Sequence, residues 1–133
     1  MRFYDTAGMD VRNRTIPAHY HTVADAYILV YSLTDRLSFQ LLVDIKKDIE
    51  KNKEKKDVPC IVIGNKLDLV KDRVVDAEMS ESWVAAERLK YWETSIFDRQ
   101  SLIEPLVFLS SKLAPQPNKT TFPQLSISRK NKE

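Results

Sequence analysis

Three short polar motifs follow one another along this chain of 133 residues: D-x-x-G at residues 5–8, N-K-x-D at 65–68 and E-T-S at 93–95. The carboxylate of Asp5 could orient a water molecule on a magnesium ion. Gly8 has no side chain in the way, so its backbone N–H could approach a phosphate. By itself this first motif is a weak signal, because Asp and Gly are also common turn residues.

The second motif, Asn65-Lys66-Leu67-Asp68, has a chemistry that matches one nucleobase. The carboxylate of Asp68 can accept two hydrogen bonds, from the N1–H and the 2-amino group of guanine. The amide of Asn65 can bond the acceptors on the other edge of the base, and the stem of Lys66 can lie along its plane. Adenine has no such pair of donors. The motif therefore favours guanine, and the alternative is a polar turn after a buried strand.

The third motif, Glu93-Thr94-Ser95, would by itself indicate only a surface turn. Its position gives it more weight. Each of the three motifs stands at the end of a predicted strand, and a predicted helix separates successive motifs. Because ligands bind at the carboxyl ends of the strands in parallel sheets, this order predicts one shared site.

The strands that would carry the motifs are indicated by apolar runs. Residues 26–33 and 58–63 are rich in β-branched and aromatic residues and do not alternate, which predicts strands buried on both faces of a parallel sheet. Residues 91–95 give a weaker strand, and residues 2–5 the stub of another.

Helical periodicity fills the intervals between these strands. Capping residues stand at the start of each predicted helix: Asp35 or Ser38, Asp76, and Asp98 or Ser101. The predicted buried faces are Phe39, Leu42, Ile45 and Ile49, then Met79, Trp83 and Ala86, then Leu102, Leu106, Leu109 and Leu113. Pro105 is expected to be tolerable only near a first helical turn. Alternating strands and helices predict an α/β fold with a doubly wound, mostly parallel sheet.

Composition excludes several classes of protein. The 21 basic and 19 acidic residues give a net charge of +2, which argues against a nucleic-acid binder. No apolar run reaches the ~18 residues of a membrane span. The single cysteine, Cys60, cannot form an internal disulfide and suits the reducing cytoplasm. Only two glycines are present, Gly8 and Gly64, and no G-x-x-x-x-G-K-[ST] loop occurs.

Taken together, DTAG, NKLD and ETS resemble the third, fourth and fifth guanine-nucleotide motifs of Ras-like small GTPases. The resemblance covers residues 1–114 and implies a partial Ras-like P-loop NTPase domain that lacks the first strands and the phosphate-binding loop. Residues 115–133 would be a flexible, polar and basic tail. The implied cofactors are GTP or GDP and Mg²⁺, with Asp5 holding the metal through water. The implied nucleotide-binding residues are Asp5, Gly8, Asn65, Lys66, Asp68, Thr94 and Ser95.

A narrower resemblance is to the kappaB-Ras proteins, the NF-kappa-B inhibitor-interacting Ras-like proteins. It is carried by PAHY, VVDAE, DRQSLIEP, KLAPQP and SRKNK, which begin at residues 17, 74, 98, 112 and 128. That family implies a monomeric regulator of NF-kappa-B signalling. Its implied partners are NF-kappa-B inhibitor proteins and a GTPase-activating complex that acts on Ral. The end of the chain shows no prenylation box. We expect the segment 10–20, with Arg12 and Arg14, to be the partner-facing loop.

The sequence departs from the Ras pattern in two places. Met9 stands where Ras-like enzymes have a glutamine that orients the attacking water, and a thioether cannot do this. The resemblance therefore implies slow or absent GTP hydrolysis. Ile96 and Phe97 replace the alanine and lysine that follow E-T-S in Ras, which changes the loop on the base side.

Three hypotheses remain open at this stage. The chain could be part of a longer GTP-binding switch protein, of which this sequence gives only one portion. It could also be a short non-enzymatic interaction module or an unrelated doubly wound domain. Without the central strand, rows of backbone groups would be left unpaired. We therefore expect the 133-residue chain to fold poorly alone, and a cooperative thermal transition with a sharp NMR spectrum would contradict this.

Overall fold

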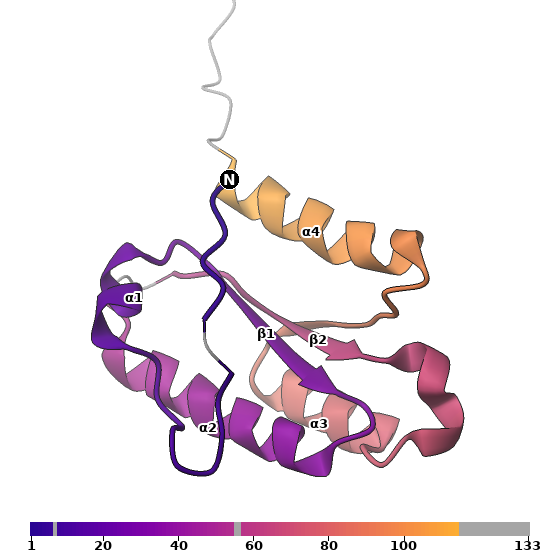
Figure 1. Ribbon diagram of the computed structural model, residues 1–133. Coiled ribbons are helices and arrows are strands. Elements are labelled where there is room, and N and C mark those ends of the chain that lie inside the picture. Colours follow the sequence, from indigo (N-terminus) through magenta and orange to yellow (C-terminus); the bar gives the residue numbers. More distant parts are fainter. Residues whose placement is uncertain (7, 55–56, 115–133) are drawn as a thin grey trace, which may run out of the picture.

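The computed structural model describes residues 1–6, 8–54 and 57–114, so the predicted tail at 115–133 lies outside the described residues. Figure 1 shows the order of the elements. They are α1 (Ala18–Val23), β1 (Tyr27–Ser32), α2 (Arg36–Asn52), β2 (Cys60–Asn65), the 3₁₀ helix η1 (Leu67–Asp72), α3 (Ala77–Ala86), β3 (Lys90–Glu93) and α4 (Arg99–Leu113). None of the described helices combines the length and the apolar character that a membrane crossing needs.

The three strands form one parallel sheet in the order β1-β2-β3. Leu29 lies opposite Val62, and Val62 opposite Tyr91, so all three side chains point to the same face. The predicted α/β fold with a parallel sheet is confirmed. The strands all end at the same edge, where Gly64 of β2 stands opposite Glu93 of β3.

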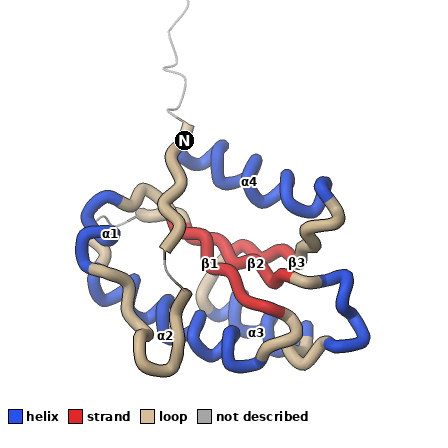
Figure 2. The backbone as a smooth tube through the Cα atoms, viewed as in Figure 1, coloured by secondary structure: helices blue, strands red, loops and turns tan. Residues whose placement is uncertain are grey.

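Helices cover the two faces of the sheet unequally. Figure 2 shows α2 and α3 on one side and α4 on the other. The main core lies on the side of α2 and α3. Its buried members are Tyr27, Leu29, Tyr31, Leu33, Phe39, Leu42, Ile49, Val62, Val75 and Val84. At about 25 cal/mol per Å² of apolar surface, this cluster supplies the main driving force for folding of the described residues.

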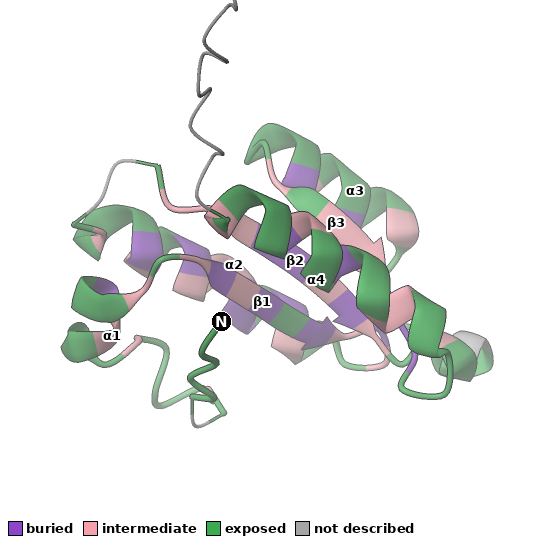
Figure 3. Ribbon diagram, turned by 90° about the horizontal axis from the view of Figure 1, so that it is seen from above, coloured by how far each residue is buried: buried purple, intermediate pink, exposed green. Residues whose placement is uncertain are grey.

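The other face of β1 is largely uncovered, because α4 packs against β2 and β3. Val30 is 57% exposed in the middle of the strand. Figure 3, coloured by burial, shows α4 lying over the neighbouring strands while β1 emerges beside it. The expectation that both apolar runs are buried on both faces is therefore wrong for β1. Its apolar sequence cannot bury its second face without a covering element.

Aspartates cap the three long helices as expected. Asp35 accepts hydrogen bonds from the backbone N–H groups of Leu37 and Ser38 at 3.0 and 3.4 Å. Asp76 and Asp98 play the same role for α3 and α4. Each cap contributes about 1 kcal/mol and fixes where its helix begins.

Four local expectations are corrected by the structure. Residues 2–5 form no strand, because they have no neighbouring strand to pair with among the described residues. Part of the predicted loop 10–20 is helical, since α1 begins at Ala18. Helix α3 buries Ser80 and Val84, while Met79 is 39% exposed and Ala86 is exposed.

The fourth correction concerns Pro105, which lies in the interior of α4. It was expected only near a first turn, because proline donates no backbone hydrogen bond and crowds the carbonyl four residues before it. Here the ring is fully buried, so packing against the sheet offsets part of that cost.

Candidate functional site

The carboxyl ends of β2 and β3 are joined by hydrogen bonds. The N–H of Thr94 donates to the carbonyl of Gly64 at 2.8 Å, and the N–H of Leu67 donates to the carbonyl of Thr94 at 3.0 Å. The Thr94 hydroxyl donates to Oδ1 of Asn65 at 3.3 Å. Two motifs that stand 28 residues apart in the sequence, counted from Asn65 to Glu93, are thus brought into one place.

A second bond links the outer parts of these two loops. The hydroxyl of Ser95 donates to Oδ1 of Asp68 at 2.8 Å. Thr94 is fully buried and Ser95 is 6% exposed, whereas Asp68 is exposed. The carboxylate is therefore held from the protein side while it remains accessible to a ligand. We name Asn65, Lys66, Asp68, Thr94 and Ser95 the base-side cluster.

The backbone at Lys66 turns sharply within this cluster. Its φ is +69°, in the left-handed region that costs a residue with a Cβ roughly 1–2 kcal/mol. The turn is closed by a hydrogen bond from the N–H of Leu69 to the carbonyl of Lys66 at 2.9 Å. Strain of this kind persists only where neighbouring contacts determine the conformation, and it is frequent at functional sites.

The loop of Ser95 is fixed by a hydroxyl on the next helix. The N–H of Ser95 donates to Oγ of Ser101 at 3.1 Å, and the Ser95 hydroxyl also accepts from the N–H of Phe97 at 3.2 Å. The side chains of Ile96 and Phe97 point outward and are 68% and 81% exposed. The departure from the Ras pattern at these positions therefore places two apolar side chains on the surface beside the cluster.

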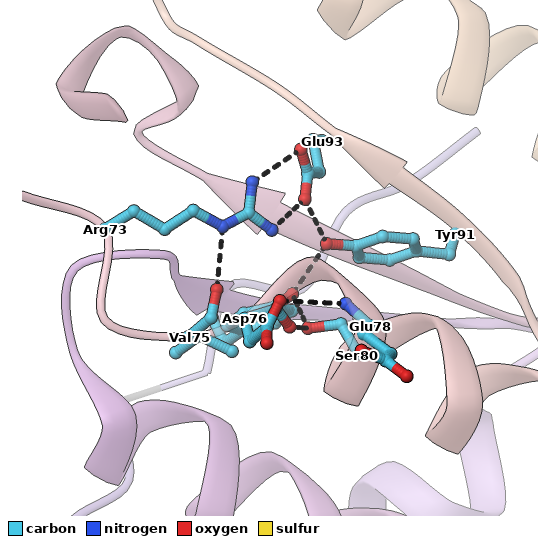
Figure 4. A network of polar contacts seen from close by, with 8 residues as sticks. Arg73, Val75, Asp76, Glu78, Ser80, Tyr91 and Glu93 are labelled. Carbon is cyan, nitrogen blue, oxygen red and sulfur yellow. Dashed lines mark hydrogen bonds and ion pairs between the residues drawn. The ribbon is translucent and has the colours of Figure 1, made fainter. Parts of the chain in front are cut away.

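Glu93 turns inward and pairs with an arginine that the sequence patterns did not identify. The guanidinium of Arg73 makes a two-pronged ion pair with the Glu93 carboxylate, in which Nη1 lies 3.1 Å from Oε2 and Nη2 bonds Oε1. Nε of the same Arg73 donates to the carbonyl of Val75 at 2.7 Å. Figure 4 shows the pair above the end of the sheet. No periodicity marks a contact of this kind, so only the fold reveals it.

The charge on Glu93 is set by two opposing effects. Burial raises the pKa of the carboxyl, but the hydrogen bonds from Arg73 and Tyr91 outweigh it and lower the pKa below its ordinary value of 4.5. Glu93 is therefore ionised at neutral pH. Burial raises the pKa of the Tyr91 hydroxyl, which consequently stays protonated and can donate.

The residues predicted for the phosphate side lie elsewhere. Asp5 and Gly8 are exposed in the irregular stretch before α1, and no described residue other than the chain neighbours of Gly8 comes within 4 Å of the place where its Cβ would be. Met9, at the expected glutamine position, is partly buried. The described contacts join none of these three to the base-side cluster.

The segment that follows is attached to α2 instead. Nη1 of Arg14 lies 2.9 Å from Oδ2 of Asp44, and the N–H of Ile16 donates to Oδ2 of Asp48 at 2.9 Å. The buried His21 of α1 adds a contact of 3.5 Å between its Nε2 and the same Asp48 oxygen. Two neighbouring acids of one helix therefore hold the N-terminal segment.

The donor sets fit the two implied ligands differently. The base-side cluster offers the carboxylate, amide and lysine stem that guanine recognition requires. Across residues 1–6, 8–54 and 57–114, no three His, Cys, Asp or Glu side chains gather into a group that could hold a metal. Asp5 is exposed in its irregular segment, and its role at a magnesium ion through water stays a prediction.

Other chemistry is not favoured by the described residues. Burial raises the pKa of the Cys60 thiol to about 12, so it is not a nucleophile at neutral pH. Two shallow depressions of about 320 and 390 Å³ lie beside His21 and beside Trp83, and neither is lined by the base-side cluster.

Comparisons with known proteins agree with these observations. A model of the Ras family matches residues 1–114. The chain is 45% identical over 132 residues to a human protein named NF-kappa-B inhibitor-interacting Ras-like protein 2, covering 99% of this chain and 67% of the relative. It is 43% identical to the mouse protein 1 of the same name, with the same coverage. A relative from Drosophila melanogaster is 38% identical over 135 residues and is also covered to 67%.

Proposed function

The chain belongs to the Ras family, and from this premise we propose that it is a GTP- or GDP-binding signalling protein that recognises guanine through its base-side cluster. We further propose that it regulates NF-kappa-B signalling by binding NF-kappa-B inhibitor proteins, and that its hydrolysis of GTP is slow or absent. The cytoplasm is the compartment in which such a role would be exercised.

One observation carries the nucleotide part of this proposal. The hydrogen bond from Ser95 to Oδ1 of Asp68 holds an exposed carboxylate at the common end of two parallel strands. An ionised carboxylate in that position can accept from both donors on the guanine edge, and charge-assisted bonds of this kind are the strong ones. The hydrogen bond from Thr94 to Asn65 joins the loops after β2 and β3 at a second point.

Nucleotide selectivity tests this part directly. The chain would be titrated with GDP, ADP and IDP in the presence of Mg²⁺ and followed by NMR of its backbone amides. We expect GDP to shift the amides of residues 65–68 and 94–95 and ADP to leave them in place. Equal responses to GDP and ADP, or no response to any of the three, would refute guanine recognition by this chain.

The proposal of slow hydrolysis rests on Met9. A methionine sulfur is a weak acceptor and cannot position an attacking water between two hydrogen bonds. If the chain binds GTP, a single-turnover assay of wild type against Met9→Gln measures the contribution of this residue. A large rate gain in the glutamine variant supports the proposal, and rapid turnover by wild type contradicts it.

The partner proposal rests on the names of the relatives, which describe those proteins as interacting with NF-kappa-B inhibitors. We propose that the segment 10–20 contributes to this contact. Arg12 is exposed, and Arg14 is paired with Asp44. A change at Arg12 therefore tests the surface charge, and a change at Arg14 also tests the attachment of the segment to α2. Arg12→Glu should weaken inhibitor binding by charge alone, whereas Arg14→Glu also releases the segment from α2. Unchanged binding by both variants would exclude this surface. A GTPase-activating complex acting on Ral, which the resemblance also implies, and a monomeric state stay predictions.

A second candidate is an interaction module that binds protein partners without nucleotide. The separation of Asp5 and Gly8 from the base-side cluster favours it, because the phosphate side is not assembled among the described residues. The same titration decides between the two. Partner binding without any response to GDP would support the module.

A further inference from the structure

A row of buried hydroxyl groups lies directly beneath the base-side cluster. The hydroxyl oxygen of Tyr31 on β1 is 2.7 Å from Oγ of Ser80 on α3 and 2.7 Å from the hydroxyl oxygen of Tyr91 on β3. The Tyr91 hydroxyl donates to Oε1 of Glu93 at 2.9 Å. Ser80 is fully buried and Tyr31 is 2% exposed. Figure 4 shows this row joining Ser80, Tyr91 and the Glu93–Arg73 pair.

Gly64 shows how closely this row approaches the strand that carries N-K-x-D. A Cβ on Gly64 would lie 2.9 Å from the Tyr91 hydroxyl oxygen and 3.0 Å from that of Tyr31. Real Cβ atoms essentially never come that close to other atoms. Glycine is therefore needed here because the two tyrosine hydroxyls, together with Cδ2 of Leu33 at 2.9 Å, occupy the space that a Cβ would take.

The charge on Glu93 fixes the direction of one bond in the row. A hydroxyl hydrogen rotates to whichever neighbour accepts it. The ionised Glu93 has no hydrogen to give, so the hydrogen of Tyr91 is used on the carboxylate. At the other end of the row, the Tyr31 hydroxyl donates to Oγ of Ser80, and Ser80 in turn donates to the backbone carbonyl of Asp76 at 3.3 Å. The 2.7 Å contact between the two tyrosine hydroxyls, in which either can donate, joins the two ends, and bonds connected in this way strengthen one another.

We propose that the hydroxyls of Tyr31, which is buried, and of Tyr91, which is partly buried, are a positioning unit that holds the ends of β2 and β3 together and thereby places the carboxylate of Asp68. The unit acts through the backbone. Tyr91 stands three residues before Thr94, whose N–H bonds the carbonyl of Gly64. This inference rests on the proposed function, because the placement of Asp68 matters only if guanine is the ligand.

The test compares two tyrosines of the same sheet. Tyr91→Phe removes one hydroxyl and keeps the ring. Tyr27→Phe is the matched control, because Tyr27 is also buried, at 9% exposure, and its hydroxyl bonds His21 at the other end of β1. Amide hydrogen exchange would be measured in the complete 133-residue chain at Leu67 and Thr94, with Lys53 at the end of α2 as the reference.

In Tyr91→Phe we expect exchange at Leu67 and Thr94 to become about tenfold faster, because the contacts of the hydroxyl with Tyr31 and Glu93 are lost, while Lys53 is unchanged. Tyr27→Phe should leave Leu67 and Thr94 as they are. Adding Tyr31→Phe to Tyr91→Phe should add little, because the two hydroxyls act together. Equal exchange at the two amides in Tyr91→Phe and Tyr27→Phe would overturn the proposal. Should Tyr91→Phe not fold, Ser80→Ala interrupts the same row, and unchanged exchange in it would be equally decisive.

The nucleotide readout is the ratio of GDP to IDP affinity, since IDP lacks the 2-amino group that Asp68 would accept from. Tyr91→Phe should lower this ratio severalfold and Tyr27→Phe should leave it unchanged, which a general loss of stability would not do. A wild-type ratio preserved in Tyr91→Phe would overturn the positioning role. If wild type binds neither nucleotide, the proposed function fails, whereas the exchange result still decides whether the hydroxyls hold the strand ends.

Discussion

The two predicted halves of the site behave differently in the structure. At the base side, four residues from two loops are paired with one another: Asn65 with Thr94 and Asp68 with Ser95. In the N-terminal segment, Asp5 and Gly8 are exposed and belong to no helix or strand. The difference shows that adjacent parallel strands are sufficient to place the residues at their own ends. A motif outside the sheet depends on other contacts for its position.

What surrounds each region explains the contrast. Beside the base-side cluster lie a partly buried, two-pronged ion pair, Arg73 with Glu93, and the row of tyrosine hydroxyls. The N-terminal segment is held by two acids on the outside of α2, and the Arg14–Asp44 pair among these contacts is 46% and 32% exposed in its side chains. Exposed pairs of this kind contribute only about 0–1 kcal/mol. The first region should therefore be the more rigid of the two.

The largest expected effect is on base recognition. Asp68→Asn retains an oxygen that can accept from Ser95 but loses the carboxylate that accepts twice from guanine. We expect GDP affinity to fall by roughly 100-fold or more, because a polar group at the site is then left with a mismatched donor. Isothermal titration with GDP measures this. Ser95→Ala is the control. It removes the hydrogen bond that Ser95 donates to Asp68 and should weaken GDP binding by much less. An unaltered GDP affinity in Asp68→Asn would show that Asp68 does not contact the base.

The next largest effect is expected at Gly64. In Gly64→Ala the new methyl group meets the hydroxyls of Tyr31 and Tyr91 and the Cδ2 of Leu33, at 2.9–3.0 Å. Forcing a methylene group into a packed site costs about 1–3 kcal/mol, so the midpoint of urea unfolding should fall. In the Tyr31→Phe/Tyr91→Phe background the same change should cost less. An equal cost in both backgrounds would mean that the hydroxyls do not make Gly64 necessary.

A smaller effect is expected at the attachment of the N-terminal segment. Asp48→Ala removes the acceptor for the N–H of Ile16, which should cost about 1 kcal/mol and speed amide exchange at Ile16 and Ala24. Asp44→Ala, which breaks only the exposed pair with Arg14, should cost close to nothing. In neither variant should exchange at Thr94 change. A response at Thr94 would show that the two regions are coupled.

The smallest effect is a change in acid stability. The pKa of Glu93 is lowered in the folded protein, so the unfolded chain takes up its proton first as the pH falls. The stabilisation from Glu93 is complete above its ordinary pKa of 4.5 and is lost as the pH falls through the folded pKa. In Glu93→Gln, the free energy of unfolding should therefore decrease less steeply than in wild type as the pH falls below 4.5. Glu104→Gln, at an exposed position on α4, is the control and should keep the wild-type slope.

Much of the fold could be predicted because local chemistry determines it. The aspartates at 35, 76 and 98 begin their helices, since each offers a carboxylate to free backbone N–H groups. The apolar runs at 26–33 and 58–63 overlap β1 and β2, because β-branched and aromatic residues pack well on a buried pleated sheet. Two of the three motifs, N-K-x-D and E-T-S, stand at the ends of β2 and β3, and the resemblance to the Ras pattern allowed their residues to be named in advance.

Errors arose where neighbours in space decide the outcome. Periodicity alone assigned Met79 and Ala86 to the buried face of α3, but both are exposed and the helix buries Ser80 and Val84 instead, whereas Trp83 packs against the core as predicted. Pro105 is tolerated in the middle of α4 because its ring packs against the sheet. The second face of β1 is exposed because α4 covers only its neighbours.

The sequence by itself determined the order of the elements, their caps and the three motifs, because these depend on residues close together in the chain. Only the tertiary structure decided that Arg73 pairs with Glu93 and that Ser80, Tyr31 and Tyr91 meet beneath Gly64. These contacts join residues 20 to 60 positions apart. A hydrogen bond requires its atoms within about 3 Å, and no pattern in the sequence carries a distance of that precision.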